Sequence, residues 1–177
     1  EAFPFIQESI PDLRMIFTGG KFDQEHPAAK KIRSLGLEEF ILHIGYRTPT
    51  EIRCLYERTK ALVYPSLFEG FGMPVAEAIE SGVPVFCSDI EPLVEIGGEA
   101  VVTFDPCSSN DIADKVLSVL RDDRLLESLR AKREAQLTRF SSEAIARQTY
   151  NLYRKTCGLD STPLESSRLA MTNGRCE

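Results

Sequence analysis

Short apolar runs alternate along much of the chain with segments in which apolar residues recur at helical spacing. The runs predict strands at residues 13–18, 40–44, 61–65, 83–87 and 100–104. Because each run is apolar almost throughout, we expect these strands to be buried on both faces, as the strands of a parallel sheet are. Strands that alternate with helices in this way are typical of an α/β fold with helices on both faces of the sheet.

The helical segments carry clear start and stop signals. The expected helices lie at residues 25–35, 49–58, 109–121, 123–138 and 142–156. The second of them begins at a capping box, because Thr48 and Glu51 stand three positions apart and a proline occupies the first helical position. From Gly158 the chain is rich in Ser and Thr and lacks periodicity. We therefore expect one domain at residues 1–156 and a flexible tail at residues 157–177.

One stretch places polar and glycine residues between two of the predicted strands: YPSLFEGFGMPVAEAIESGVPVFCSD, residues 64–89. We expect the strand at residues 61–65 to end at its proline, a loop to follow, and a helix to begin near Met73. Gly82 would end that helix just before the next strand. Because open α/β sheets bind ligands at the carboxyl ends of their strands, the loop lies where a binding site is expected.

The residues around this loop suit a ligand with phosphates between two hydroxyl-bearing ends. At the helix start, the amides of Phe71, Gly72 and Met73 can donate to a phosphate or a sugar hydroxyl. Gly70 and Gly72 would let such a ligand approach the backbone.

Two glutamates flank the glycines. Glu77, one turn into the helix, can accept hydrogen bonds from vicinal ribose hydroxyls, and Glu69 is placed for hydroxyls at the other end of the ligand. A nucleotide-diphosphate sugar is a ligand of this kind. Each feature alone also has a structural explanation, because an acidic residue near a helix start stabilises the helix dipole and a Gly-x-Gly turn can serve packing only.

Composition and charge exclude several classes of protein. The 177 residues, of which 42% are hydrophobic and 27% charged, describe a chain with one sizeable core. A net charge of −6 argues against a nucleic-acid partner, and the basic run RAKR at residues 130–133 is interpreted as a solvated helix face. No apolar run approaches the roughly 20 residues of a membrane span. The first residue, Glu1, is not Met, which suggests a piece of a longer protein.

The five cysteines are odd in number and scattered, without the spacing of a metal site. Neither a disulfide framework nor a zinc site is indicated, and a reducing cytoplasm fits this pattern best. His26 and His43 are interpreted as structural or surface residues rather than catalysts.

The string SLFEGFGMPVAEAIESGVPV closely resembles the nucleotide-sugar motif of the retaining GT-B glycosyltransferases called glycosyltransferase family 4. Two glutamates with seven residues between them mark that motif, and Glu69 and Glu77 match them. The segments LRMIFTGG, LGLEEFILHIGY, LYERTKALVYPS and SDIEPLVEIGGEAVVTFDP are similar to successive pieces of the family's C-terminal donor domain. The resemblance covers residues 1–156 and implies a Rossmann-like parallel sheet, the C-terminal half of a GT-B fold.

The resemblance also implies a role for each matching residue. Glu69 would contact the transferred sugar as the catalytic glutamate, and Glu77 would hold the ribose hydroxyls. The amides of residues 71–73 would serve the sugar hydroxyls and the diphosphate. In the segment HIGYR, Gly45 and Tyr46 would border the nucleobase.

For the reaction, the resemblance implies transfer of a glycosyl group with retention of configuration, without a metal and without a cofactor. The donor would be a UDP-, GDP- or ADP-linked sugar. The acceptor, a glycan, lipid or small molecule, would be bound by an N-terminal domain that this sequence lacks. Asp89 and Glu91 are interpreted as part of an ordinary connection rather than a metal site. The protein is expected to be cytoplasmic, or peripheral at the inner face of a membrane.

The sequence departs from the family at its start. The family's donor domain begins with a strand and a basic pair that would precede Glu1, and that strand lies in the middle of the sheet. We therefore expect a gap between the strands at residues 13–18 and 61–65. We also expect the isolated chain to fold poorly or to need an upstream segment, and to be inactive alone; a sharp, cooperative thermal transition would contradict the first expectation.

Two other functions are compatible with the same residues. One is a sugar-nucleotide epimerase or hydrolase of GT-B architecture, which needs no glycosyl acceptor. The other is a non-catalytic module that only binds a nucleotide sugar.

Overall fold

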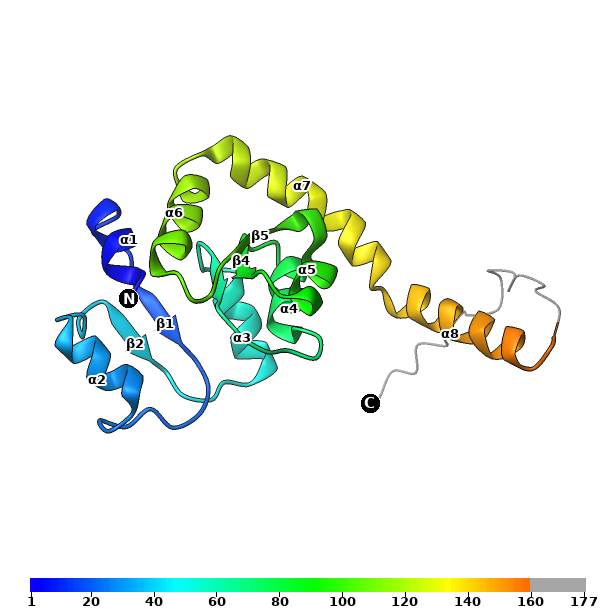
Figure 1. Cartoon of the computed structure of the whole chain (residues 1–177), viewed down its shortest axis with the longest axis horizontal. Helices are drawn as coiled ribbons and strands as arrows, with labels where there is room; N and C mark the ends of the chain where they lie inside the picture. The colour runs from blue at the N-terminus through cyan, green and yellow to red at the C-terminus, as the bar shows by residue number, and fades with distance from the viewer. Residues whose placement is uncertain (160–177) are drawn as a thin grey trace, which may run out of the picture. The chain divides into compact units, whose positions relative to one another are not determined.

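The computed structural model describes residues 1–159, which divide into a first unit, Glu1–Leu137, and a second that begins at Thr138 (Figure 1). The elements of the first unit are, in chain order, α1 (Phe3–Ser9), β1 (Met15–Phe17), α2 (Pro27–Ser34), β2 (Ile41–His43), α3 (Pro49–Tyr56), β3 (Leu62–Tyr64), α4 (Met73–Glu80), β4 (Val85–Ser88), α5 (Glu91–Gly97), the 3₁₀ turn η1 (Gly98–Ala100), β5 (Val101–Phe104), α6 (Ser109–Leu120) and α7 (Asp123–Arg139), whose last residues pass into the second unit. Helix α8 (Ser142–Thr156) belongs to the second unit.

The strands of the first unit form two parallel sheets. In one, which we call the outer sheet, β1 pairs with β2, and Ile16 stands opposite Leu42. In the other, the central sheet, β4 lies between β3 and β5, and Phe86 stands between Val63 and Val102. The predicted gap between the strands at residues 13–18 and 61–65 is confirmed, because β1 and β3 belong to different sheets.

The central sheet carries helices on both faces, which confirms the predicted α/β fold class. Side chains alternate between the faces along β4, so Phe86 packs on one side with Ile6 of α1 and Val116 of α6. Helices α4 and α5 pack against the central strands as well. Phe86 and Leu93 of α5 are fully buried. The core of the unit therefore lies around β4.

The outer sheet corrects one sequence-based expectation. Its strands were expected to be buried on both faces, but the exposed fractions of the Ile16, Phe17 and Leu42 side chains are 47%, 38% and 51%. The physical reason is that a two-stranded sheet gives each strand only one neighbour, so less of its surface is removed from water. An aromatic side chain provides part of the cover, since Phe22 stacks against His43 with ring centroids 4.7 Å apart.

Most helix signals read from the sequence are confirmed. The capping box of α3 forms as predicted: the Glu51 amide donates to Thr48 Oγ1 (3.3 Å), and the Thr48 amide donates to Glu51 Oε2 (2.7 Å). His26, expected to be a structural or surface residue, is the N-cap of α2, where its Nδ1 accepts from the Ala28 amide (3.2 Å). Helices α6, α7 and α8 lie within one residue of their predicted bounds.

Helix α5 was not anticipated. Its signals were present in the sequence, because Glu91 and Pro92 form a good first turn and Leu93 and Ile96 stand three residues apart on a buried face. The predicted flexible tail falls almost wholly on residues outside the described part of the chain.

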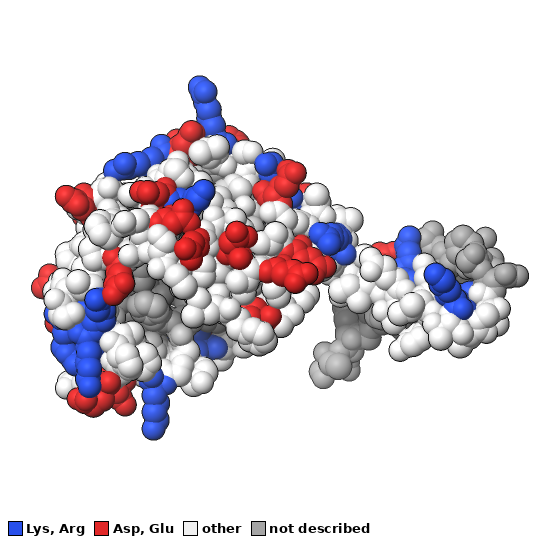
Figure 2. Space-filling model, viewed as in Figure 1, with Lys and Arg blue, Asp and Glu red and all other residues white. Residues whose placement is uncertain are grey.

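Charges on the face shown in Figure 2 are unevenly spread, with acidic groups over much of the first unit and basic groups gathered near α2 at the lower left. Two lysines of α2 form ion pairs, Lys30 with Glu25 (2.7 Å) and Lys31 with Glu1 (2.8 Å). In the run RAKR, Lys132 pairs with Glu99 (3.4 Å). These pairs are largely exposed, so each contributes little to stability.

Candidate functional site

The turn between β3 and α4, residues 65–72, lies at the carboxyl edge of the central sheet, as predicted. Strand β3 ends at Tyr64, and α4 begins at Met73 with Pro74 in its first turn, where its missing N–H leaves no helical hydrogen bond unmade. Gly72 is the N-cap and adopts a left-handed conformation (φ 96°, ψ 49°). The chain therefore reverses sharply from the strand into the helix.

The two glycines of the turn differ in what surrounds them. Gly72 is buried, and a Cβ at this position would collide with Leu93 Cδ2 of α5. Its lack of a side chain therefore serves both the left-handed backbone and the packing of α4 against α5. Gly70 is exposed, and a Cβ there would have no atom within 4 Å. The backbone at Gly70 is thus open to a ligand.

Glu69 is half-buried and is held by a phenol. Tyr64, the last residue of β3, donates a hydrogen bond from its hydroxyl to Glu69 Oε1 (2.5 Å). Burial, followed by the hydrogen bond to Glu69 and the charge of this carboxylate, raises the pKa of Tyr64 to about 12. Tyr64 therefore stays protonated and able to donate at all physiological pH values.

Glu77 is exposed, and a second phenol lies close enough to feel its charge. Burial, and after it the negative charge of Glu77, raise the pKa of Tyr56 to about 12. The Tyr56 hydroxyl donates to the Pro74 carbonyl in the first turn of α4 (3.3 Å). Tyr56 also adds to the upward pKa shift of Tyr64, so the two phenols lie near each other.

Sequence reasoning did not single out Tyr56 and Tyr64. A signal was available, because each is the last residue of its element, α3 and β3, at the point where the chain leaves for a loop. A phenol at such a position combines an apolar ring for the core with a hydroxyl for the edge.

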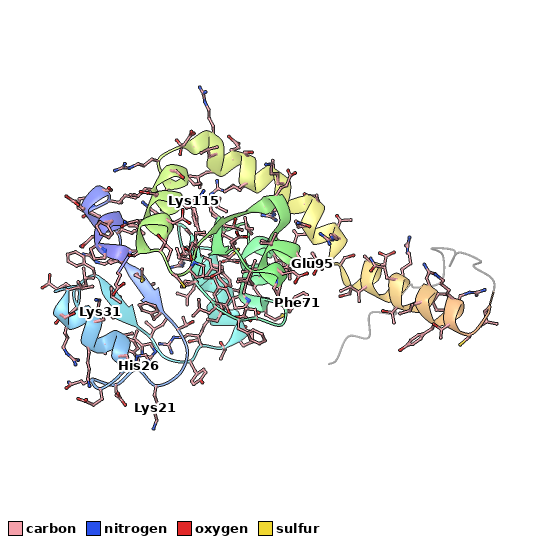
Figure 3. The ribbon with its side chains drawn as sticks, viewed as in Figure 1. Lys21, His26, Lys31, Phe71, Glu95 and Lys115 are labelled. Atoms are coloured by element: carbon pink, nitrogen blue, oxygen red, sulfur yellow. The ribbon has the colours of Figure 1, made fainter. Side chains whose placement is uncertain are left out.

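The start of α4 presents polar backbone together with exposed apolar side chains. The Val75 amide is occupied by the Gly72 carbonyl (2.9 Å), so the N–H of Met73, at the first position of α4, is the helix amide placed to face a ligand. Phe71, labelled in Figure 3, lies beside the start of α4. Leu67 and Phe68 project from the same turn with 68% and 89% of their surface exposed.

Gly45 and Tyr46 lie on a different loop, after β2 of the outer sheet. Gly45 has φ 70°, and its carbonyl accepts from the Gly19 amide (3.0 Å) in the loop after β1. The Tyr46 hydroxyl lies 3.5 Å from the place a Cβ on Gly20 would occupy, and its side chain is 82% exposed. Within residues 1–159, no hydrogen bond joins Gly45 or Tyr46 to α4 or its turn. The predicted site residues thus fall into two groups.

A polar cavity of about 380 Å³ opens at the ends of β4 and β5, at the same edge of the central sheet. Its lining includes Asp89, Thr103, Asp111 and Lys115. Among the described residues, no group of three or more His, Cys, Asp or Glu side chains has the arrangement of a metal site.

Comparison with known proteins identifies the family. Residues 1–136 match the family described as Glycosyl transferases group 1. The chain belongs to this family. Among curated relatives of this glycosyltransferase domain, O-antigen chain mannosyltransferase B of Escherichia coli is 38% identical over 117 residues, which are 66% of this chain and 31% of the relative. The D-inositol 3-phosphate glycosyltransferase of Corynebacterium aurimucosum is 28% identical over 165 residues, 88% of this chain and 38% of the relative.

Solved structures agree with the family. A domain described as the C-terminal domain of a glycosyl transferase group 1 family protein, LpcC of Francisella tularensis, has a TM-score of 0.65 at 25% identity and covers 78% of this chain and 77% of its own. A mutant of S. aureus TarM, in a complex that includes UDP, has a TM-score of 0.73 at 25% identity over 86% of this chain and 31% of its own. The predicted GT-B C-terminal domain is confirmed.

The chain spans about a third of the length of the two curated relatives described above. No helix within the described residues is both long and apolar enough to cross a bilayer.

Proposed function

We propose that this domain binds a nucleotide-diphosphate sugar and forms the donor half of a larger glycosyltransferase that transfers the sugar with retention of configuration. The observation that carries the proposal is the placement of Glu69 and Glu77 on either side of the start of α4, at the carboxyl edge of the central sheet. This edge is where α/β proteins bind nucleotides. Membership of the glycosyl transferases group 1 family supports the reaction class.

Each part of the turn has a role in this proposal. Glu77 accepts hydrogen bonds from the ribose hydroxyls, and the exposure of its carboxylate supports this role. Glu69 contacts the transferred sugar as the catalytic residue, on the side away from Tyr64. The backbone of residues 70–73 faces the sugar hydroxyls and the diphosphate, supported by the open space at Gly70. Gly45 and Tyr46 border the nucleobase from the loop after β2.

During transfer, the bond between the sugar and the diphosphate breaks and negative charge grows on the departing phosphate. The start of α4 carries roughly half a positive charge and amide donors in fixed positions, so it stabilises that charge without reorganising. The chemistry proposed for these residues therefore requires neither a metal nor a cofactor. The donor is a UDP-, GDP- or ADP-linked sugar.

We propose that an N-terminal domain binds the acceptor. A match of this chain to only 31% of the mannosyltransferase supports a longer protein. Leu67, Phe68 and Met73 support it too, because exposed apolar groups beside a polar site suit a surface that another part of the protein covers. The acceptor is a glycan, a lipid or a small molecule, and the protein is cytoplasmic or peripheral at the inner face of a membrane.

Ligand binding by the full-length protein tests the proposal. UDP, GDP, ADP and their common sugar conjugates are titrated calorimetrically against the wild type and the Glu77→Ala and Glu69→Ala variants. Loss of a charged acceptor to ribose in Glu77→Ala costs about 1.5–3 kcal/mol, on the order of tenfold to a hundredfold in affinity. Glu69→Ala weakens binding of the sugar conjugate more than binding of the bare nucleoside diphosphate.

Glu80 provides a matched control, because it is an exposed glutamate at the end of the same helix. Glu80→Ala leaves the affinities unchanged. Equal losses for sugar-bearing and sugar-free ligands in both site variants would refute the separate roles of Glu69 and Glu77. Measurement of nucleotide release with and without a glycosyl acceptor distinguishes a transferase from an epimerase, a hydrolase or a binding module.

A further inference from the structure

Glu69 stands on a loop, whereas the group that holds it stands on a strand. Residues 65–72 contain no helix or strand, and a carboxylate on such a segment loses conformational entropy when it is fixed to meet a ligand. Among the described residues outside the turn, the Tyr64 hydroxyl is the one group that forms a hydrogen bond with the Glu69 side chain. The position of this carboxylate therefore depends on how firmly Tyr64 itself is placed.

Tyr64 lies on β3, which pairs with β4, the most buried strand among the described residues. It stands opposite Cys87 in the parallel pairing of β3 with β4, and the Ser88 hydroxyl donates to its carbonyl at 3.5 Å. Cys87 and Ser88 are both fully buried. Because β3 pairs with this buried strand, its backbone is held more firmly than the turn that carries Glu69.

The direction of the hydrogen bond leaves part of the carboxylate available. Tyr64 donates to Oε1 of Glu69, and within residues 1–159 no hydrogen bond reaches Oε2. A carboxylate has lone pairs on both oxygens and can accept from two partners at once. One oxygen is thus fixed by the protein while the other stays able to accept from a ligand hydroxyl.

We propose that Tyr64 is a positioning residue, which holds Glu69 so that its Oε2 accepts a hydrogen bond from a hydroxyl of the transferred sugar. Through this contact, the protein binds the sugar-bearing donor more tightly than the bare nucleoside diphosphate. The inference rests on the proposed function. Tyr64 touches the sugar only through Glu69, so it is not itself a catalytic residue. Its high pKa, about 12, keeps the phenol a donor over the working pH range.

A purely structural role for Tyr64 makes a different prediction. If the hydrogen bond only shaped the turn, its loss would displace Gly72 and Met73 together with Glu69, because they belong to the same segment. Affinities for the sugar conjugate and for the nucleoside diphosphate would then fall alike. The ratio of the two affinities separates the two roles.

The test is a double-mutant cycle on the full-length protein with Tyr64→Phe, Glu69→Ala and the double variant. UDP, GDP, ADP and their glucose and mannose conjugates are titrated calorimetrically against each. For the sugar conjugate that the wild type binds most tightly, we expect Tyr64→Phe to lower the affinity about tenfold. The affinity for the matching nucleoside diphosphate should change less than about twofold. In the Glu69→Ala background, Tyr64→Phe has no further effect, because the carboxylate it positions is gone.

Tyr56→Phe is the matched control, because it also removes a half-buried phenol hydroxyl next to this site, but one that donates to a carbonyl rather than to Glu69. It leaves the ratio of conjugate to diphosphate affinity unchanged. An unchanged ratio in Tyr64→Phe, or an equal effect of this substitution with and without Glu69, overturns the inference. A wild type that binds none of the ligands refutes the proposed function instead, and the inference with it.

Discussion

The two sheets of the first unit are built from strands that look alike in the sequence and differ in their surroundings. Strand β4 is buried at all four of its positions, whereas two of the three residues of β1 are exposed. Both strands are parallel and apolar. The difference arises because β4 has a strand on each side and helices over both faces, while β1 has a single neighbour. Apolar content alone therefore does not determine how far a strand is buried.

The same difference divides the candidate site. Glu69 and Glu77 are attached to the central sheet through the turn and α4, and Glu69 is further held by Tyr64. Gly45 and Tyr46 are attached to the outer sheet, and Tyr46 is largely exposed. We expect the sugar end of a bound donor to meet rigid groups and the base end to meet groups that adjust on binding.

The largest expected effect is a loss of stability that differs between the central sheet and the outer sheet. Phe86→Ala removes a fully buried ring from the middle of the central sheet and should lower the free energy of unfolding by about 3–5 kcal/mol. Phe17→Ala in the outer sheet removes a ring that is already 38% exposed and should cost about 1 kcal/mol. Urea unfolding of both variants measures the difference. Similar losses would mean that the outer sheet is as well packed as the central one.

A smaller difference in stability is expected between alanine substitutions at Gly72 and Gly45, the two candidate-site glycines with positive φ. Gly72→Ala adds a Cβ that collides with Leu93 and also strains the backbone. The free energy of unfolding of the protein should therefore fall by about 2–4 kcal/mol. Gly45→Ala adds strain alone, about 1 kcal/mol, because no atom lies within 4 Å of the new Cβ. Thermal unfolding compares them. A larger loss at Gly45 would show that the loop after β2 is packed more tightly than its surroundings indicate.

The smallest effect concerns Tyr64 and high pH. Its pKa in the folded protein, about 12, lies above the ordinary value of 10.0, so the folded state holds the phenolic proton more tightly. The stability that follows is fully present below pH 10 and is lost as the pH rises from 10 through 12. Unfolding free energies of the wild type and Tyr64→Phe over this range test the point. If both decline equally, Tyr64 is not the group responsible.

Much of the fold could be predicted because its signals are local. The capping box at Thr48 and Glu51, the proline at the start of α4 and the apolar runs of the strands all depend on residues close in sequence, and the corresponding elements form. The turn with Glu69 and Glu77 was located in the same way, at the carboxyl end of a strand. Helix α5 was missed although its signals were local, because the segment was interpreted as a connection.

What could not be predicted depends on residues distant in sequence. The exposure of β1 and the collision that a side chain at Gly72 would cause with Leu93 depend on segments that only the fold brings together. The bond between Tyr64 and Glu69 spans five residues, but its formation depends on how the turn folds back over the strand.

The sequence by itself determined the order of the strands, the α/β class and the residues that form the turn, because periodicity, caps and glycine positions act over a few residues. Only the tertiary structure decided how far each strand is buried and that a phenol on the central sheet holds the glutamate of the turn. The physical reason is that burial and side-chain hydrogen bonds depend on which surfaces meet, and that follows from the packing of the whole unit.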